Sequence, residues 1–281
     1  MQLRRNFLPR TVADAGCFLL IFVFIPITFV FELAIVLPEF HDIGSFIYIS
    51  TWVAGIFILF NVKGNMIACM LVDTSIHTTL LQPPGDVNKR KHWHYCDDCE
   101  VLAPPRSWHC YICRTCILKR DHHCFFTGCC VGQTNHRFFI LFMLYVFIGS
   151  AYTTIYNSIY FWWLHAATFA NLTTCLKMVL PLLMFTLDTS WNNFYLLIYE
   201  LNIVAFVYSL VLILFHLPLL LRGNVSYERG SLKYDLGWRS NLMVVMGRRM
   251  KWVWLSPFIK SELPYDGVHW EAVMQLSAKN R

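Results

Sequence analysis

Eight of the eleven cysteines lie within 35 residues, and their spacing is that of metal ligands. Three pairs, 96/99, 110/113 and 113/116, have the spacing Cys-x2-Cys, with which a turn presents two thiolates to one tetrahedral zinc ion. A segment this short cannot bury enough apolar surface to fold alone, so we expect bound metal to hold it together. The eight are Cys96, Cys99, Cys110, Cys113, Cys116, Cys124, Cys129 and Cys130.

The number of donor groups exceeds what two metal ions need. Two tetrahedral zinc ions take eight ligands, whereas the segment holds eight cysteines and three histidines, His109, His122 and His123. The run Asp121-His122-His123-Cys124 supplies a thiol, a base and a carboxylate that can orient the base, which is what nucleophilic catalysis requires. The residues alone leave open the alternative that every cysteine and histidine here only binds metal or packs in the domain.

Long apolar runs surround this segment and predict that membrane helices position it. The runs 15–37, 46–62, 138–164 and 194–221 are each about long enough to cross a bilayer. The first run is too long for the core of a cleaved signal, so we expect it to remain in the mature chain. A shorter run, 172–187, contains Lys177 and Pro181 and is expected to be re-entrant or interfacial. We therefore predict an all-α integral membrane protein with four transmembrane helices and a small cysteine-rich domain between the second and third.

The placement of lysine and arginine predicts the orientation. Three lie in the first ten residues, nine in 63–137 and ten from residue 222 onward, whereas the loop 38–45 has none and the loop 165–193 has only Lys177. Because positive charge marks the cytosolic side, both termini and the cysteine-rich segment are expected in the cytosol. Thiols stay reduced there, which excludes a disulfide framework. The net charge of +6 reflects this bias and attraction to the lipid bilayer, and no nucleic acid is expected as a partner.

Three stretches together resemble a known family: His109 to Cys116, then Asp121-His122-His123-Cys124, then Cys130-Val131-Gly132-Gln133-Thr134-Asn135. They are similar to the cysteine-rich domain of the DHHC-type protein S-acyltransferases, and the resemblance covers residues 96–139. It implies an integral-membrane palmitoyltransferase with two structural Zn²⁺ ions. One ion would be bound by Cys96, Cys99, His109 and Cys116, the other by Cys110, Cys113, His123 and Cys130. That leaves Cys124 as nucleophile, His122 as its base and Asp121 orienting His122.

The resemblance also implies a reaction and its partners. Cys124 would take a long-chain acyl group from an acyl-CoA such as palmitoyl-CoA and pass it to cysteines of substrate proteins near the cytosolic membrane face. Phe125 and Phe126 are expected to contact the acyl chain. The cations nearest in sequence, Lys119, Arg120 and Arg137, are candidates for binding the CoA phosphates. The expected division is 1–72 (N-terminal segment and two helices), 73–137 (zinc domain), 138–221 (two helices and a lumenal loop) and 222–281 (cytosolic tail), in a Golgi or endoplasmic reticulum membrane.

The chain departs from the family pattern at several positions. Phe125-Phe126 replaces Pro-Trp, and Cys129 replaces an asparagine; Cys129 is expected to be a small packing residue rather than a second acyl site. The Asp-Pro-Gly motif is reduced to Pro83-Pro84-Gly85, and the Thr-Thr-x-Glu motif to Val225-Ser226-Tyr227-Glu228. The C-terminal motif is matched by Tyr234-Asp235-Leu236-Gly237 with Asn241 and Gly247.

Other functions remain as alternatives. A membrane-anchored zinc-binding adaptor or a RING-like ubiquitin ligase would use the domain only to hold a partner, but would have no use for Asp121-His122 beside a thiol that two zinc ions do not need. A catalytically weak scaffold of the same family is a third interpretation. No internal repeat is visible. Glu32 is expected to be wetted at the non-cytosolic end of its run, and His216 to lie at the membrane interface.

Overall fold

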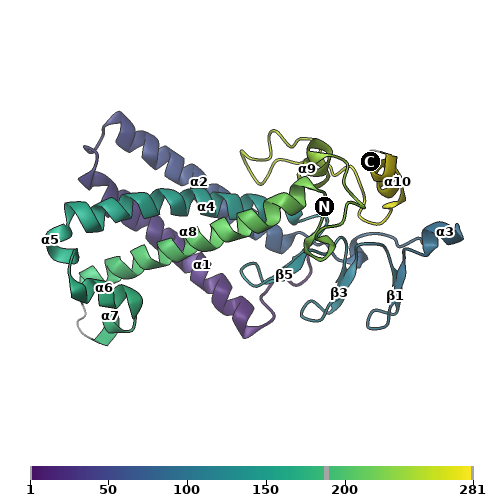
Figure 1. Cartoon of the computed structure of the whole chain (residues 1–281), viewed down its shortest axis with the longest axis horizontal. Coiled ribbons are helices and arrows are strands. Elements are labelled where there is room, and N and C mark those ends of the chain that lie inside the picture. The colour runs from purple at the N-terminus through teal and green to yellow at the C-terminus, as the bar shows by residue number, and fades with distance from the viewer. Residues whose placement is uncertain (1, 187–189, 280–281) are drawn as a thin grey trace. The chain divides into compact units, whose positions relative to one another are not determined.

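Four long helices dominate the computed structural model, which describes residues 2–186 and 190–279 (Figure 1). They are α1 (Val12–Phe31, continued by helical turns to Glu39), α2 (Phe46–Leu71), α4 (His136–Ile159, continued to Leu164) and α8 (Trp191–Leu221). The shortest has 26 residues; at 1.5 Å per residue it is about 39 Å long, more than the hydrocarbon thickness of a bilayer. The predicted fold class is confirmed, and the chain is a multi-pass membrane protein.

Helix α2 continues past the apolar run that ends at residue 62 and reaches Leu71. Asn61 lies inside the run and Asn65 beyond its end, but both are fully buried instead of facing solvent. At Gly64 an added Cβ would lie 2.6 Å from Cγ of Pro257, so the C-terminal tail packs directly against this turn of the helix. Hydropathy underestimated the length of α2 because the polar side chains of this helix are buried by tertiary packing.

The chain forms two compact units. We call residues 1–21, 63–142 and 214–281 the cysteine-rich unit, and residues 22–62 and 143–213 the helical unit. Each of the four long helices contributes residues to both.

The helical unit has an aromatic core. A buried cluster joins α1 and its continuation to α4, α8 and the segment between them; it comprises Phe31, Val36, Tyr160, Phe161, Phe169, Met184, Leu196, Ile198 and Tyr199. Glu32 is not wetted as expected: it is only 3% exposed, and Nδ2 of Asn157 donates to its Oε2 at 3.2 Å. The correction follows from helix packing, because the partner amide is on a different helix and is invisible to a scan of one apolar run.

Between α4 and α8 the described residues form short helices only, α5 (Ala166–Phe169), α6 (Leu172–Val179) and α7 (Leu183–Thr186). None is long enough to cross a bilayer. The run predicted to be re-entrant or interfacial, 172–187, thus corresponds to α6 and α7, with its last residue outside the described part of the chain.

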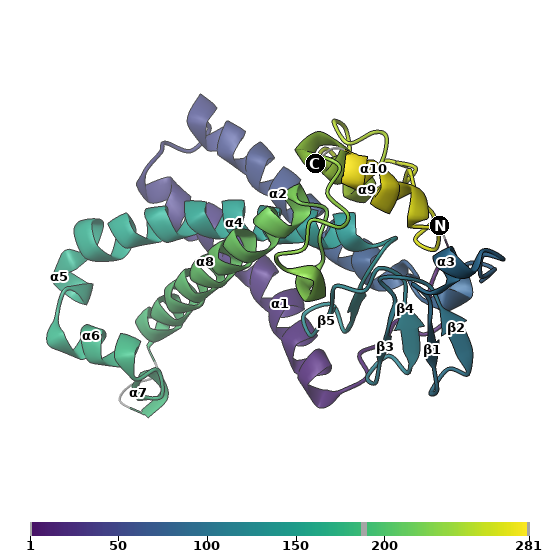
Figure 2. The ribbon, with the colours of Figure 1, turned by 45° about the vertical axis from the view of Figure 1, so that its right-hand side comes forward.

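Three antiparallel hairpins form the centre of the cysteine-rich unit, side by side in both views (Figures 1 and 2). The first pairs β1 (His94–Cys96) with β2 (Val101–Ala103), the second β3 (Trp108–Cys110) with β4 (Thr115–Ile117), and the third β5 (His122–Cys124) with β6 (Cys129–Val131). All three lie between α2 and α4, where the small domain was predicted.

The hairpins are structural repeats that the sequence alone did not reveal. Cys96, Cys110 and Cys124 each end a first strand, and successive members are 14 residues apart. Each is followed by a four-residue turn whose last residue has a positive φ: 51° at Glu100, 53° at Arg114 and 59° at Gly128. The expectation of no internal repeat was wrong because backbone conformation repeats here while few residue types do.

Short helices and turns complete this unit: α3 (Val87–Arg90), α9 (Trp238–Met246), α10 (Glu271–Lys279) and the 3₁₀ turns Ile76–Thr78 and Ser226–Glu228.

Gly132 lies where the third hairpin leads toward α4. An added Cβ would be 2.6 Å from the Leu118 carbonyl oxygen and 2.7 Å from Oγ1 of Thr74, so only glycine fits without displacement.

Candidate active site and metal centres

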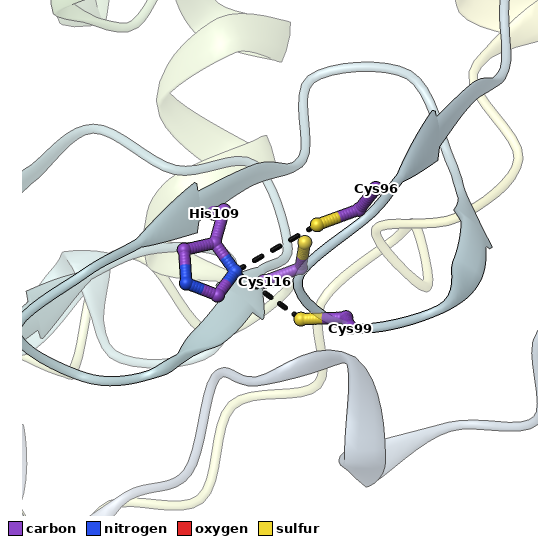
Figure 3. A group of neighbouring side chains, drawn as sticks. All are labelled: Cys96, Cys99, His109 and Cys116. Carbon is purple, nitrogen blue, oxygen red and sulfur yellow. Dashed lines mark hydrogen bonds between the residues drawn. The ribbon is translucent and has the colours of Figure 1, made fainter.

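The first two hairpins build one four-residue donor group (Figure 3). Cys96 and Cys99 come from the first hairpin, and His109 and Cys116 from the two strands of the second. Nδ1 of His109 lies 3.7 Å from Sγ of Cys96 and 3.2 Å from Sγ of Cys99, and all four donor atoms are within 4.8 Å of one another. Zn–S and Zn–N bonds of about 2.3 and 2.0 Å separate tetrahedral donors by about 3.5 Å, so three thiols and an imidazole at these distances fit zinc.

The second and third hairpins repeat this arrangement. Nδ1 of His123 lies 3.7, 3.4 and 3.7 Å from Sγ of Cys110, Cys113 and Cys130, respectively. Its other ring nitrogen, Nε2, is 3.1 Å from Oδ1 of the fully buried Asp14 in α1. A carboxylate on the far nitrogen fixes the orientation of a metal-binding histidine. Sequence reasoning missed Asp14, whose only signal is an acid just before the first apolar run.

The N-terminal segment also binds this second group. Nη2 of Arg4 donates to the carbonyl oxygen of Cys130 at 3.3 Å, and Arg10 donates to the carbonyl oxygen of Cys113. A zinc ion with three thiolates carries a net negative charge, so two guanidinium groups beside it are electrostatically favourable.

Cys124 belongs to neither group, although it occupies in the third hairpin the position of Cys96 and Cys110 in the first two. The reason is that the third hairpin is the last of the three. Each of the first two hairpins receives a histidine and a cysteine from the next hairpin, and no fourth hairpin follows the third in the part of the chain that the structure describes. Thr127 also stands where the earlier turns have their second cysteine. The thiol of Cys124 is therefore left for other chemistry.

Asp121 and His122 lie beside that thiol. Nδ1 of His122 donates to Oδ2 of Asp121 at 2.6 Å, and a side-chain hydrogen bond links His122 to Cys124. Burial lowers the pKa of His122, but the bonds to Asp121 and Cys124 outweigh it and raise that pKa to about 9. Burial raises the pKa of Asp121, yet its bond to His122 and the nearby imidazoles hold it below its usual range. The three predicted residues are thus brought together with Asp121 ionised.

The reduced Thr-Thr-x-Glu motif holds Asp121 in place. The backbone N–H of Ser226 donates to Oδ1 of Asp121 at 2.7 Å, and Oγ of Ser226 is 3.1 Å from both carboxylate oxygens. Two residues on, Glu228 pairs with Arg106 through bonds of 2.8 and 2.6 Å. A serine hydroxyl thus lies where the family motif supplies a threonine hydroxyl.

Comparison with known proteins places this geometry in a family. The model of the family described as DHHC palmitoyltransferase matches residues 89–233. The chain belongs to the DHHC palmitoyltransferase family. It is 36% identical over 225 residues to the human "Probable palmitoyltransferase ZDHHC24", covering 75% of each chain, and 33% identical over 226 residues to the mouse protein of that name, covering 76% of this chain and 75% of the relative. It is 33% identical over 175 residues to the Arabidopsis thaliana "Probable protein S-acyltransferase 12", covering 60% of this chain and 55% of that protein.

Two of the departures from the family pattern, Phe125-Phe126 and Cys129, lie close to Cys124. Phe125 is exposed in the turn of the third hairpin with its ring 5.7 Å from that of His123, and Phe126 is half-buried. Cys129, the cross-strand partner of Cys124, is buried, with its Sγ 3.5 Å from the carbonyl oxygen of Cys69 and 3.4 Å from Oγ1 of Thr127. Contact of the two phenylalanines with an acyl chain stays a prediction.

The three cations named as candidates for CoA do not form one exposed patch. Lys119 is only 2% exposed, and burial together with the charge of Arg106 lowers its pKa to about 7. Arg137 is also buried, with its guanidinium over the ring of Phe138. Arg120 is partly exposed and lies 5.5 Å from the ring of Tyr227. Of the three, Arg120 is therefore the best placed to meet a phosphate.

Proposed function

We propose that this chain is a protein S-acyltransferase that moves a long-chain acyl group from an acyl-CoA to Cys124 and then to cysteines of substrate proteins. The observation that carries the proposal is the separation of roles in the cysteine-rich unit. Eight residues form two complete metal-binding groups, and the Asp121–His122 pair lies beside a thiol that neither group uses. The names of the relatives, palmitoyltransferase and S-acyltransferase, support the same reaction.

In the first step, Sγ of Cys124 would attack the carbonyl carbon of the acyl-CoA thioester. His122 takes the proton from the thiol at Nε2 and returns it to the sulfur of the departing CoA. In the second step, His122 takes the proton of a substrate cysteine, whose sulfur attacks the acyl group on Cys124, and the proton returns to Cys124. One thioester replaces another at each step, so the reaction needs a positioned base rather than an energy source.

Asp121 supports this proton transfer by fixing the orientation and tautomer of the His122 ring. Because Asp121 accepts the hydrogen of Nδ1, Nε2 is the nitrogen left to exchange a proton with the thiol. Ser226 in turn holds the carboxylate through backbone and hydroxyl bonds. Zinc in the two Cys₃His groups would stabilise the hairpins that carry these residues, since protein donors fill all four positions at each.

Placement in a membrane suits the substrate. A palmitoyl chain has about 15 carbons beyond its carbonyl, and each buried methylene contributes roughly 0.8 kcal/mol. Cys124 itself is only 6% exposed, which would protect an acyl thioester from hydrolysis. We also propose that both termini are cytosolic and that the protein resides in the Golgi or endoplasmic reticulum, as the basic residues and the family suggest.

The test is transfer of an alkyne analogue of palmitoyl-CoA to the purified full chain. We expect a label that hydroxylamine removes, that Cys124→Ser abolishes and that the matched control Cys175→Ser retains, because Cys175 is an exposed cysteine on α6. Chasing the labelled protein in liposomes with a membrane-anchored cysteine peptide should move the label to the peptide. Label that survives Cys124→Ser but is lost in Cys129→Ser would show that the wrong thiol has been assigned.

A further inference from the structure

His216 of α8 lies against the catalytic pair, although the acyl-transfer reaction gives it no task. Its Nδ1 is 3.7 Å from Oδ2 of Asp121, and its ring centroid is 5.3 Å from that of His122. The side chains of Asp121 and His216 are 1% and 6% exposed, whereas that of His122 is 28% exposed. One donor atom from each of the three residues lies within 4.8 Å of the other two.

The donor set is one that divalent metals prefer. Two imidazoles and one carboxylate form a common zinc site, in which a water molecule completes the tetrahedron. Such donors are about 3.3 Å apart around zinc. The Asp121–His216 distance is close to this value, while the 2.6 Å between Asp121 and His122 must lengthen by less than 1 Å. Small rotations of two side chains would therefore suffice.

We propose that Asp121, His122 and His216 form a third metal site, distinct from the two Cys₃His groups, at which Zn²⁺ reversibly inhibits the enzyme. The site has no thiolate, so it binds zinc more weakly than either Cys₃His group and exchanges it with the medium. The exposed part of His122 gives the ion a path to the two buried ligands.

Inhibition depends on which of the two ring nitrogens of His122 carries a hydrogen. This part of the inference rests on the proposed function. Zinc on Nδ1 displaces the hydrogen that Asp121 accepts; this hydrogen goes to Nε2 or, where Nε2 already carries one, to solvent. A ring with its hydrogen on Nε2 has no lone pair facing Cys124 and cannot take the thiol proton. The ion replaces the hydrogen bond between His122 and Asp121, and when the ion leaves, the Nδ1 hydrogen returns and restores that bond.

The metal count tests the site without requiring acyl transfer. Purified full-length Cys124→Ser, which removes the rival thiol, is equilibrated with micromolar Zn²⁺, and bound zinc is measured. We expect three zinc ions per chain in Cys124→Ser and two in Cys124→Ser/His216→Phe, where phenylalanine keeps the ring contacts with Phe139 but offers no donor. The matched control His77→Phe, at an exposed histidine outside the site, should retain three. Two ions in Cys124→Ser, or three in its His216→Phe variant, would overturn the proposal.

An activity measurement then tests inhibition. We expect His216→Phe to raise the zinc concentration for half-maximal inhibition of acylation at least about tenfold, with His77→Phe unchanged and a weak chelator restoring the wild-type rate. Equal inhibition of wild type and His216→Phe would refute the inhibitory role. Should none of the variants acylate even without zinc, the proposed function fails while the metal count still decides the site. If His216→Phe does not fold, which loss of the two structural zinc ions would reveal, His216→Gln takes its place.

Discussion

Arg106 links the segment between the first two hairpins to the C-terminal tail, and replacing it should release the tail. Its guanidinium makes bonds of 2.8 and 2.6 Å to Glu228 and 2.7 Å to the Gly223 carbonyl oxygen. It also lies 4.0 and 4.3 Å from the ring centres of Tyr234 and Trp270. The side chain of Arg106 is 1% exposed and that of Glu228 15%, so the pair is shielded from water.

Arg106→Met leaves the carboxylate of Glu228 buried without its counter-charge. Removing one partner of a buried pair typically costs about 3 to 5 kcal/mol, and the lost cation–π contacts add to this. At about 2 to 4 °C per kcal/mol, a loss of about 3 kcal/mol lowers the melting temperature by about 6 to 12 °C. Because Ser226 lies two residues from Glu228, acylation of Cys124 should fall as well.

The assay is thermal unfolding in detergent, followed by tryptophan fluorescence, together with limited proteolysis of the tail. Glu228→Gln is the matched partner variant, since it keeps the shape of the side chain and removes its charge. The double variant Arg106→Met/Glu228→Gln should be more stable than Arg106→Met alone by about 1 kcal/mol or more, because no buried charge is left unpaired. A double variant no more stable than Arg106→Met would refute this electrostatic explanation.

Three further outcomes follow from the structure. Ser226→Ala removes a hydroxyl bonded to the Asp121 carboxylate, a contact of about 1.5 to 3 kcal/mol, so acylation should slow about tenfold or more; Ser226→Thr should keep the wild-type rate, and equal rates for the alanine and threonine variants would contradict this. Cys130→Ser should lose the second zinc ion and retain the first, so metal analysis of folded protein should find one ion per chain, against two in Cys124→Ser without added zinc. Gly132→Ala places a Cβ 2.6 Å from the Leu118 carbonyl oxygen and should lower the free energy of unfolding by about 1 to 3 kcal/mol, whereas a wild-type melting temperature would show that the backbone yields there.

Local spacing was enough to predict a metal-binding segment and the membrane spans, whereas the division of the donors into two groups came from the family resemblance. Each metal-binding group uses residues from adjacent hairpins, so cysteine and histidine spacing carries most of the information. The four spans could be predicted because each apolar run is longer than the apolar stretches found in helices of soluble proteins. Even here, α2 extends past its apolar run because buried asparagines continue it.

Residues from distant parts of the chain could not be predicted in this way. Asp14 reaches His123 across 109 positions, and Ser226 reaches Asp121 across 105. For His216 the sequence predicted only a place at the membrane interface and did not reveal that its side chain is buried beside Asp121. Glu32 was misjudged for the same reason, since its partner Asn157 is 125 positions away. Their roles depend on tertiary packing, which the pattern of residues along one segment does not record.

The three hairpins have a consequence for how reactivity arises in a metal-binding domain. Cys124 has the backbone setting of a ligand, with the same strand end and the same kind of turn as Cys96 and Cys110. What sets it apart is its place at the terminus of an array. Grafting one more module of the same kind onto the array, with cysteine in place of Thr127, would convert this sulfur into a structural ligand. Catalysis would then be silenced by lengthening the scaffold, with every original residue except Thr127 unchanged.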